Sequence, residues 1–186
     1  MRIIGGVFKG KKLILPNDKN TRPLKDLVKE SIFNLIQHSN KVNIKIKNSL
    51  ILDLFSGSGS FGLECLSREA QKVIFLENYP EAIKILERNI KSLRSIDNYE
   101  IIKKDFFNFS NFKGNIKIKF DIIFIDPPYK ELKINEIIEM ILENNLLKQK
   151  GILIIHRHKN DTVKLTNKIN IFEERFYGIS KIYFCN

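Results

Sequence analysis

The stretch FDIIFIDPPYK, residues 120–130, joins an apolar run to an acid, two prolines and an aromatic ring. The run from Ile122 to Ile125 is typical of a strand that is buried on both faces. Prolines cannot donate hydrogen bonds to a sheet, so the strand should end at Asp126. The carboxylate of Asp126 and the ring of Tyr129 are therefore predicted to lie at the end of a buried strand.

An acid and a ring in this place suit the methylation of an exocyclic amine on a nucleobase. Such an amine is a poor nucleophile because its lone pair is delocalised into the base. The carboxylate of Asp126 and the carbonyl of Pro127, held by the proline rings, could accept hydrogen bonds from both N–H groups and direct the lone pair at an electrophile. The ring of Tyr129 offers a stacking surface for a base that has left its stack. Catalysis of this kind depends on positioning and charge stabilisation.

A second stretch, DLFSGSGSFGLE at residues 53–64, matches G-x-G-x-x-G through Gly57, Gly59 and Gly62. Glycine lets the backbone adopt positive φ and approach a ligand closely. The free N–H groups of the following helix favour an anionic group. The match predicts a nucleotide cofactor at this turn, although a tight strand–helix turn without a ligand gives the same pattern.

Two further acids end the next two predicted strands. Glu77 closes KVIFLE, where a carboxylate can accept both hydroxyls of a ribose. Asp105 closes EIIKKD and precedes FFNF, so it could hold an adenine by its amino edge while a ring stacks on the base. At least two of the rings of Phe106, Phe107 and Phe109 are expected in the core. Three successive strand ends thus fit an adenosine ligand.

The acid before the glycines separates two classes of cofactor. A nicotinamide dinucleotide carries a pyrophosphate, which an adjacent carboxylate would repel. S-adenosylmethionine carries an ammonium and no pyrophosphate, so Asp53 favours this cofactor.

The elements that must position these residues follow from the apolar periodicity. Strands are predicted at 49–55, 72–77, 100–105, 120–126 and 151–156, and helices at 61–68, 80–93 and 135–147. Residues 169–176 and 179–184 read as a closing hairpin with a turn at 177–178. This alternation predicts an α/β fold with a mostly parallel seven-stranded sheet, helices on both faces and an antiparallel C-terminal strand. A small basic hairpin or loop and a helix starting at Pro23 or Asp26 precede it.

Composition sets the broader limits. The 186 residues suit one domain, with residues 1–40 as an N-terminal extension and residues 49–186 as the core. The net charge of +11 favours polyanionic partners, although lysines scattered over a solvated surface give the same sum. Without an apolar leader or a run of about 20 apolar residues, we expect a soluble cytoplasmic protein, and nothing requires more than a monomer. Cys65 and Cys185 have no partners at metal-ligand spacing, so no metal site is expected.

The chain resembles class I S-adenosylmethionine-dependent amino-methyltransferases in four motifs, in order DLFSGSGSFGLE, FLE, KKD and IDPPY. It further resembles bacterial 16S ribosomal RNA guanine-N2 methyltransferases of the RsmD type in the segments MRIIGGVFKGKKL, TRPLKDLVKESIFNLI and YGISKIYF. The resemblance extends over almost the whole chain. It implies a Rossmann-like fold, S-adenosyl-L-methionine as cofactor, and transfer of a methyl group to the N2 amine of a guanine in 16S ribosomal RNA or a small-subunit assembly particle.

By position, the resemblance also implies three sets of site residues. The cofactor would be bound by Asp53, Phe55, Gly57, Gly59, Glu77, Asp105 and Phe106. The acceptor amine would be held by Asp126, Pro127, Pro128 and Tyr129. The RNA would be contacted by Arg2, Lys9, Lys11, Lys12, Arg22 and Pro23.

Two departures from the family pattern concern the surroundings of the base. The usual Arg-Pro-Thr is Arg-Pro-Leu here, which removes a hydroxyl at residue 24. The fifth strand is followed by HRHK where an acid is common, and we expect His156 and His158 to be surface or substrate-edge residues.

Several alternatives remain open from the sequence alone. An adenine-N6 nucleic-acid methyltransferase shares the DPPY chemistry, but a reader of duplex sequence normally needs a recognition domain for which 186 residues leave no room. A protein glutamine methyltransferase usually carries Asn in place of Asp126. A non-catalytic RNA-binding or assembly protein could retain the fold, and an NAD oxidoreductase lacks a catalytic donor set.

Overall fold

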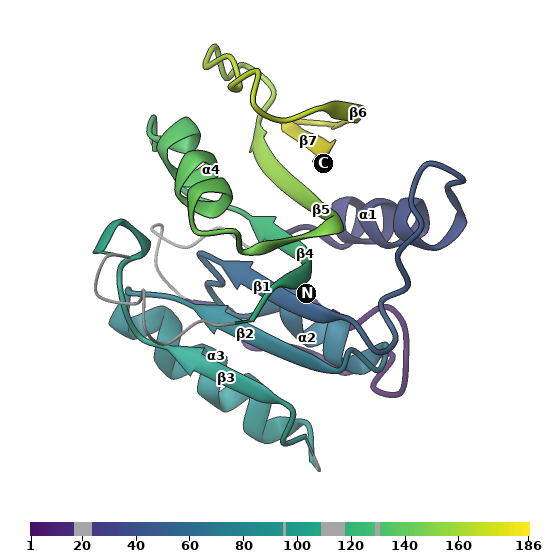
Figure 1. Cartoon of the computed structure of the whole chain (residues 1–186). Coiled ribbons are helices and arrows are strands. Elements are labelled where there is room, and N and C mark those ends of the chain that lie inside the picture. The colour runs from purple at the N-terminus through teal and green to yellow at the C-terminus, as the bar shows by residue number, and fades with distance from the viewer. Residues whose placement is uncertain (17–23, 95, 109–117, 129–130) are drawn as a thin grey trace.

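The computed structural model describes residues 1–16, 24–94, 96–108, 118–128 and 131–186. Within these residues, seven strands form one sheet in the order β3-β2-β1-β4-β5-β7-β6 (Figure 1). The strands are β1 Leu50–Leu54, β2 Lys72–Leu76, β3 Tyr99–Ile102, β4 Phe120–Ile125, β5 Leu147–His158, β6 Ile171–Tyr177 and β7 Ser180–Cys185. The helices are α1 Asp26–His38, α2 Ser60–Ser67, α3 Pro80–Ser92 and α4 Ile134–Glu143.

The sheet is parallel from β3 to β5, and β7 pairs antiparallel with both β5 and β6. This confirms the predicted fold class. The chain builds outward from β1 to β3 in one direction and from β4 onward in the other, so the order of the strands reverses between β1 and β4. In open α/β sheets, ligands bind at the carboxyl ends of the strands on either side of such a reversal.

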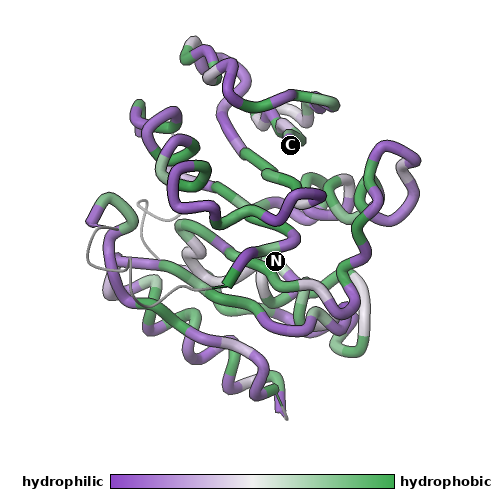
Figure 2. Tube along the Cα trace, in the orientation of Figure 1, coloured by the Kyte–Doolittle hydropathy of each residue, from purple (hydrophilic) through white to green (hydrophobic). Residues whose placement is uncertain are grey.

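Helices cover both faces of the sheet, as its buried strands require. One core unites α1, α2 and α3 with alternate residues of the strands, and the other unites α4 with the residues between them. A stack of rings joins α1, α2 and β4, with the centroid of Phe61 5.3 Å from that of Phe33 and 4.2 Å from that of Phe124. Figure 2 shows the apolar residues concentrated along the central strands and the inner sides of the helices.

The N-terminal segment, residues 1–16, lies against the body of the protein. A single β-bridge joins Arg2 to Lys12, and the side chains of Ile3 and Leu13 enter the core beside α1 and α2. At its far end, the N–H of Ile14 donates to Oδ1 of Asn89 on α3 over 2.7 Å. Of the predicted alternatives, hairpin or loop, the structure shows a bridged loop that is packed on α1, α2 and α3.

The structure corrects several predicted boundaries. β3 ends at Ile102, and not at Asp105, because its partner β2 ends at Leu76, which is paired with Ile102. Helix α4 ends at Glu143, and not at residue 147, because Asn145 takes a left-handed conformation with φ 54° and the N–H of Leu146 returns to the carbonyl of Ile141. β5 accordingly begins at residue 147, four residues earlier than predicted.

Among the described residues, no helix combines the length and the apolar character needed to cross a membrane.

Candidate active site

The turn after β1 has the tight geometry that its glycines predict. Gly57 and Gly59 adopt positive φ of 55° and 83°. Gly59 and Gly62 also allow close packing, because an added Cβ would lie 2.4 Å from the side chain of Leu86 and 2.2 Å from that of Phe75, respectively. Phe55 has φ 58° although it is not a glycine, a conformation that is uncommon for a large side chain and concentrated at functional sites.

Asp53 lies beneath this turn, near the end of β1. Its side chain is 1% exposed, and Oδ2 accepts a hydrogen bond of 2.9 Å from the N–H of Gly62. Burial raises the pKa of Asp53 well above its usual range, the N–H of Gly62 opposes this effect, and the negative charges of Asp126 and Glu77 raise the pKa further. Three carboxylates from neighbouring strands are thus gathered around the turn, a setting that favours a cationic ligand.

Glu77 follows β2 and binds the backbone on both sides of the site. Its Oε2 accepts from the N–H of Gly57 over 2.7 Å, and its Oε1 accepts from the N–H groups of Asn78 and Tyr79 over 2.9 Å each. These three bonds tie the glycine turn to the start of α3. A carboxylate offers about four acceptor positions, so the structure leaves Glu77 fewer for ribose hydroxyls than the sequence alone suggests.

Asp105 and the phenylalanines after it lie in a turn beyond β3. Oδ1 of Asp105 accepts from the N–H of Phe107 over 3.0 Å, which closes the turn. The ring of Phe106 is 1% exposed and belongs to the core on the α4 face, so it offers no open stacking face in this structure. If Phe106 contacts the cofactor, it therefore does so through its backbone. Phe107 is partly buried, and Phe109 lies outside the described residues.

Asp126 directly follows β4, on the opposite side of the strand-order reversal from Asp53. Its N–H donates to the carbonyl of Leu54 over 3.4 Å, which places the two strand ends side by side. The side chain of Asp126 is 15% exposed, Pro127 is buried and Pro128 is exposed. Tyr129 lies outside the described residues.

The sequence predicts His156 as a surface or substrate-edge residue, and the structure contradicts the first of these two alternatives. Its ring is buried with 1% exposure, Nδ1 lies 2.8 Å from Oδ1 of Asp126, and Nε2 lies 2.9 Å from Oγ of Ser180. The reason is the sheet order: β5 lies between β4 and β7, and His156 pairs with Ile182 of β7 directly after the last pair with β4, Ile125 with Ile155. The strand also continues to His158, past the predicted end at residue 156.

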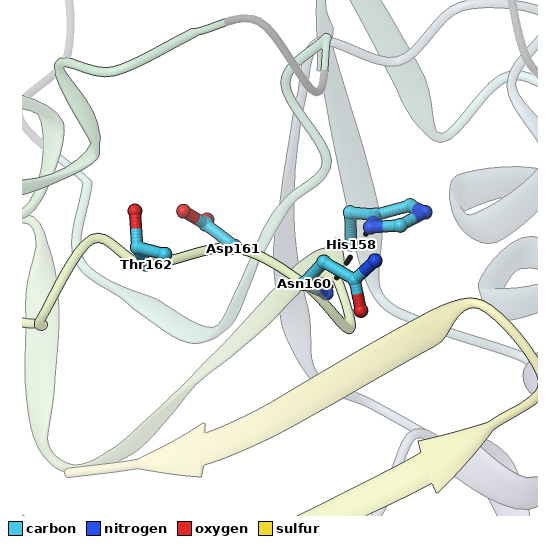
Figure 3. A pocket seen from close by; sticks show the side chains of 4 residues that line it. All are labelled: His158, Asn160, Asp161 and Thr162. Atoms are coloured by element: carbon cyan, nitrogen blue, oxygen red, sulfur yellow. Dashed lines mark hydrogen bonds between the residues drawn. The ribbon is translucent and has the colours of Figure 1, made fainter.

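Beyond His156, the end of β5 forms a surface hollow. The hollow is lined by His158, Asn160, Asp161 and Thr162, and Nδ1 of His158 accepts from the N–H of Asn160 over 3.1 Å (Figure 3). Arg157 is buried beside it and pairs with Asp161. This arrangement places His158 at the carboxyl end of β5, and its expected role as a surface or substrate-edge residue stays a prediction.

Of the six predicted RNA-contacting residues, the structure describes four. Lys9, Lys11 and Lys12 are exposed on the N-terminal segment. Arg2 is exposed and forms an ion pair of 3.7 Å with Asp26. Arg22 and Pro23 lie outside the described residues.

Two glycines of this segment, Gly5 and Gly6, allow it to pack closely at the end of α2. A Cβ on Gly6 would lie 1.8 Å from the carbonyl oxygen of Ser67, and a Cβ on Gly5 would lie 2.3 Å from the guanidinium of Arg68. Gly10 has no atom within 4 Å of such a position.

A buried ion pair, which the sequence does not reveal, holds the segment in place. Glu64 on α2 is fully buried and accepts from the N–H groups of Ile4 and Gly5, each over 2.8 Å. Lys29 on α1 is fully buried as well, and its Nζ lies 3.7 Å from Oε2 of Glu64 and donates to the carbonyl of Arg2 over 2.5 Å. Burial lowers the pKa of Lys29, while the charges of Glu64 and Asp26 oppose that effect. In the sequence, the sign of this pair is that Glu64 and Lys29 lie on the apolar sides of two predicted helices.

Comparison with known proteins identifies the family. A family model described as conserved hypothetical protein 95 matches residues 1–186. The chain is 33% identical over 180 residues to the ribosomal RNA small subunit methyltransferase D of Haemophilus influenzae, and the match covers 96% of this chain and 90% of that protein.

Two solved structures share the whole fold. One from Escherichia coli, with a proposed methyltransferase activity, has a TM-score of 0.81 and 25% identity, and the match covers 100% of this chain and 96% of that one. Another from Haemophilus influenzae, a proposed methylase, has a TM-score of 0.77 and 30% identity, and the match covers 99% and 96% of the two chains. The chain therefore belongs to the conserved hypothetical protein 95 family, which is the family of RsmD-type ribosomal RNA small subunit methyltransferases.

Proposed function

We propose that this protein transfers a methyl group from S-adenosyl-L-methionine to the exocyclic N2 amine of a guanine in 16S ribosomal RNA. The observation that carries the proposal is the position of Asp126, at the end of β4 and beside the end of β1 at the strand-order reversal. An acceptor acid and a glycine turn at adjacent strand ends suit the transfer of a group from a nucleotide cofactor to an amine. The name of the Haemophilus influenzae relative supports ribosomal RNA as the substrate class.

The charges around the glycine turn fit S-adenosylmethionine. Among the described residues, no Lys, Arg or His forms an ion pair with Asp53, although the acid is buried and two further carboxylates influence it. A ligand with an ammonium and a sulfonium would neutralise this cluster, whereas a pyrophosphate would be repelled by it. When bound, the cofactor supplies an electrophilic methyl group.

The chain's own residues divide the remaining tasks. Asp53 would receive the ammonium, Glu77 a ribose hydroxyl, and Asp105 with the backbone of Phe106 the adenine. Phe55 and the glycine turn would form the wall against which the cofactor lies. Asp126 and the carbonyl of Pro127 would accept hydrogen bonds from the guanine amine, and Tyr129 would stack on the base.

The RNA would approach along the basic N-terminal segment. Lys9, Lys11 and Lys12 are exposed there. Near its end, the segment is bound by the side chain of Asn89, whose Nδ2 also donates to the carbonyl of Ser58 in the glycine turn over 3.0 Å. Lys12 lies two residues before Ile14, so a phosphate chain held at this part of the segment would lie near the cofactor site. The substrate would be 16S ribosomal RNA or a small-subunit assembly particle, bound by a monomer in the cytoplasm.

The test is methyl transfer from labelled cofactor to small-subunit RNA or its assembly particles, followed by digestion to nucleosides. N2-methylguanosine is the expected product, and the family resemblance points to guanine 966 of 16S ribosomal RNA. N6-methyladenosine as the sole product would show that the enzyme methylates adenine and not guanine. Failure to bind the cofactor, together with binding of RNA, would favour a non-catalytic assembly protein.

A further inference from the structure

His156 lies in the middle of a three-residue chain that crosses three strands. The ring is buried on β5 and lies between Asp126, at the end of β4, and Ser180, at the start of β7. Its two nitrogens are 2.8 Å and 2.9 Å from the oxygens of these two partners. Ser180 is itself 4% exposed, so water does not compete for this contact.

The chemistry of the partners fixes the direction of the hydrogen bonds. An ionised carboxylate can only accept, so Nδ1 of His156 donates its hydrogen to Asp126. In a neutral ring Nε2 is then an acceptor, and the hydroxyl of Ser180 is the donor that satisfies it. The hydroxyl thus selects the tautomer in which the other nitrogen holds the carboxylate.

We infer that His156, oriented by Ser180, is a positioning residue that holds the carboxylate of Asp126 in the orientation needed for the acceptor amine. The inference rests on the proposed function, because it assigns His156 a role only through Asp126. A carboxylate turns about two side-chain bonds, and the contact with Nδ1 of His156 favours one of its directions. A misplacement of about 1 Å at a reacting group can reduce the rate by about 100-fold.

The next residue of β5 holds the other end of the same segment. Nη2 of Arg157 donates to the carbonyl of Glu131 over 2.8 Å, and its Nε donates to Asp161. Successive residues of a strand point to opposite faces, so His156 and Arg157 reach residues 126 and 131 from the two sides of the sheet. β5 therefore contacts both Asp126 and Glu131.

Two isosteric substitutions separate positioning from packing. In His156→Asn, the amide nitrogen occupies roughly the place of Nδ1 and still donates to Asp126. In His156→Gln, the amide occupies roughly the place of Nε2 and reaches toward Ser180 instead. His156→Ala removes both contacts, and His38→Ala, at the exposed end of α1, is the matched control.

We expect His156→Ala and His156→Gln to lower kcat for methyl transfer by about 10- to 100-fold. His156→Asn should remain within a few-fold of the unchanged protein, and Ser180→Ala should lower kcat by about two- to tenfold, the value of one neutral hydrogen bond. The affinity for S-adenosylmethionine, measured by calorimetry, should be the same in all variants. His38→Ala should behave as the unchanged protein.

The outcomes separate this inference from the proposed function. If the unchanged protein transfers no methyl group to small-subunit RNA, the proposed function fails. If it does and His156→Ala keeps its kcat, the positioning role is wrong while the function stands. Equal reductions of kcat in the Asn and Gln variants, or a fall in cofactor affinity together with kcat, would show a structural role in its place.

Discussion

At the scale of single residues, Asp126 has the most direct consequence for activity. It is assigned to the acceptor amine, whereas the contacts with the cofactor are assigned to other residues. Asp126→Ala should therefore abolish detectable methyl transfer while leaving the dissociation constant of S-adenosylmethionine within about threefold of its original value. Asp126→Asn should keep part of the activity, because an amide oxygen still accepts one hydrogen bond. Single-turnover transfer and calorimetry measure the two effects. Full turnover in Asp126→Ala would contradict the assignment.

Asp53 should make the stability of the ligand-free protein depend on pH. Burial raises its folded-state pKa above the usual value of 3.8, so between these two values the folded protein holds a proton that the unfolded chain has released. The contribution of Asp53 to the free energy of unfolding therefore falls as the pH rises from about 4 through the raised pKa.

Asp53→Asn should remove this contribution. We expect the stability of the variant to fall less than that of the unchanged protein over that pH range, as measured by denaturant unfolding at a series of pH values. The same substitution should weaken cofactor binding, because it removes the charge assigned to the ammonium. Parallel pH curves for the two proteins would mean that Asp53 does not titrate abnormally.

Single-residue predictions from the sequence succeed where the chemistry is local. The positions of Asp53 and Asp126 at strand ends follow from the apolar runs and prolines beside them. The burial of His156 could not be predicted in this way, because its partners lie 30 and 24 residues away in the chain and meet it only through the order of the strands.

At the scale of elements, the buried pair between α1 and α2 anchors the N-terminal segment. Glu64→Gln would leave the ammonium of Lys29 buried without its full counter-charge, so we expect the free energy of unfolding to fall by about 3–5 kcal/mol. The backbone N–H groups of Ile4 and Gly5 should also exchange faster with solvent. Denaturant unfolding and hydrogen exchange measure these effects.

The chain offers a matched control for this prediction. Glu69 pairs with Lys47 over 3.1 Å, but both side chains are more than half exposed. Glu69→Gln should therefore change the free energy of unfolding by about 1 kcal/mol or less. Equal effects of the two substitutions would show that the buried pair does not anchor the segment.

The exposed face of the N-terminal segment should determine how RNA binding depends on salt. Replacing Lys9, Lys11 and Lys12 together by Gln should weaken RNA binding and reduce the slope of log affinity against log salt by about 0.7–0.9 for each phosphate that the lysines no longer neutralise. Cofactor affinity should not change. Filter binding or fluorescence anisotropy over a range of salt concentrations gives the slope.

A second triple variant controls for net charge. It carries substitutions at three exposed lysines near the amino ends of the parallel strands, Lys45, Lys47 and Lys150. These positions lie at the edge of the sheet opposite the candidate site, so the slope should change little. A similar reduction of the slope in both variants would mean that RNA binding follows net charge and not the N-terminal segment.

The elements themselves are largely predictable, and the errors have physical causes. The helix start at Pro80 is predicted correctly because the signal of a proline is local, and the start at Asp26 is one of the two that the sequence predicts for α1. The end of α4 is missed because Leu146 and Leu147 continue the apolar period, whereas the left-handed Asn145 that ends the helix leaves no strong mark in the sequence.

At the scale of the whole molecule, the cofactor should stabilise the fold by mass action. The sites assigned to it come from the ends of β1, β2 and β3 and exist together only in the folded protein. At a concentration 100 times its dissociation constant, S-adenosylmethionine should add about 2.7 kcal/mol to the free energy of unfolding. For a chain of this size, that corresponds to an increase in Tm of about 5–10 °C.

Thermal unfolding with and without ligand checks this prediction, and NAD serves as the comparison. NAD should leave Tm unchanged because its pyrophosphate would lie beside Asp53. An increase with NAD and none with S-adenosylmethionine would contradict the cofactor assignment and leave the fold unaffected.

The docking of the N-terminal segment on α2 also sets an order of events during synthesis. Residues 1–16 leave the ribosome well before Glu64, whose side chain binds Ile4 across 60 residues of chain. β1 likewise lacks one of its two neighbours until β4 has been made, because Ile51 pairs with Ile122. Before α2 has been made, the nascent N-terminal segment is therefore not yet anchored. Its lysines, Lys9, Lys11 and Lys12, are then exposed close to the RNA of the ribosome that is making the chain.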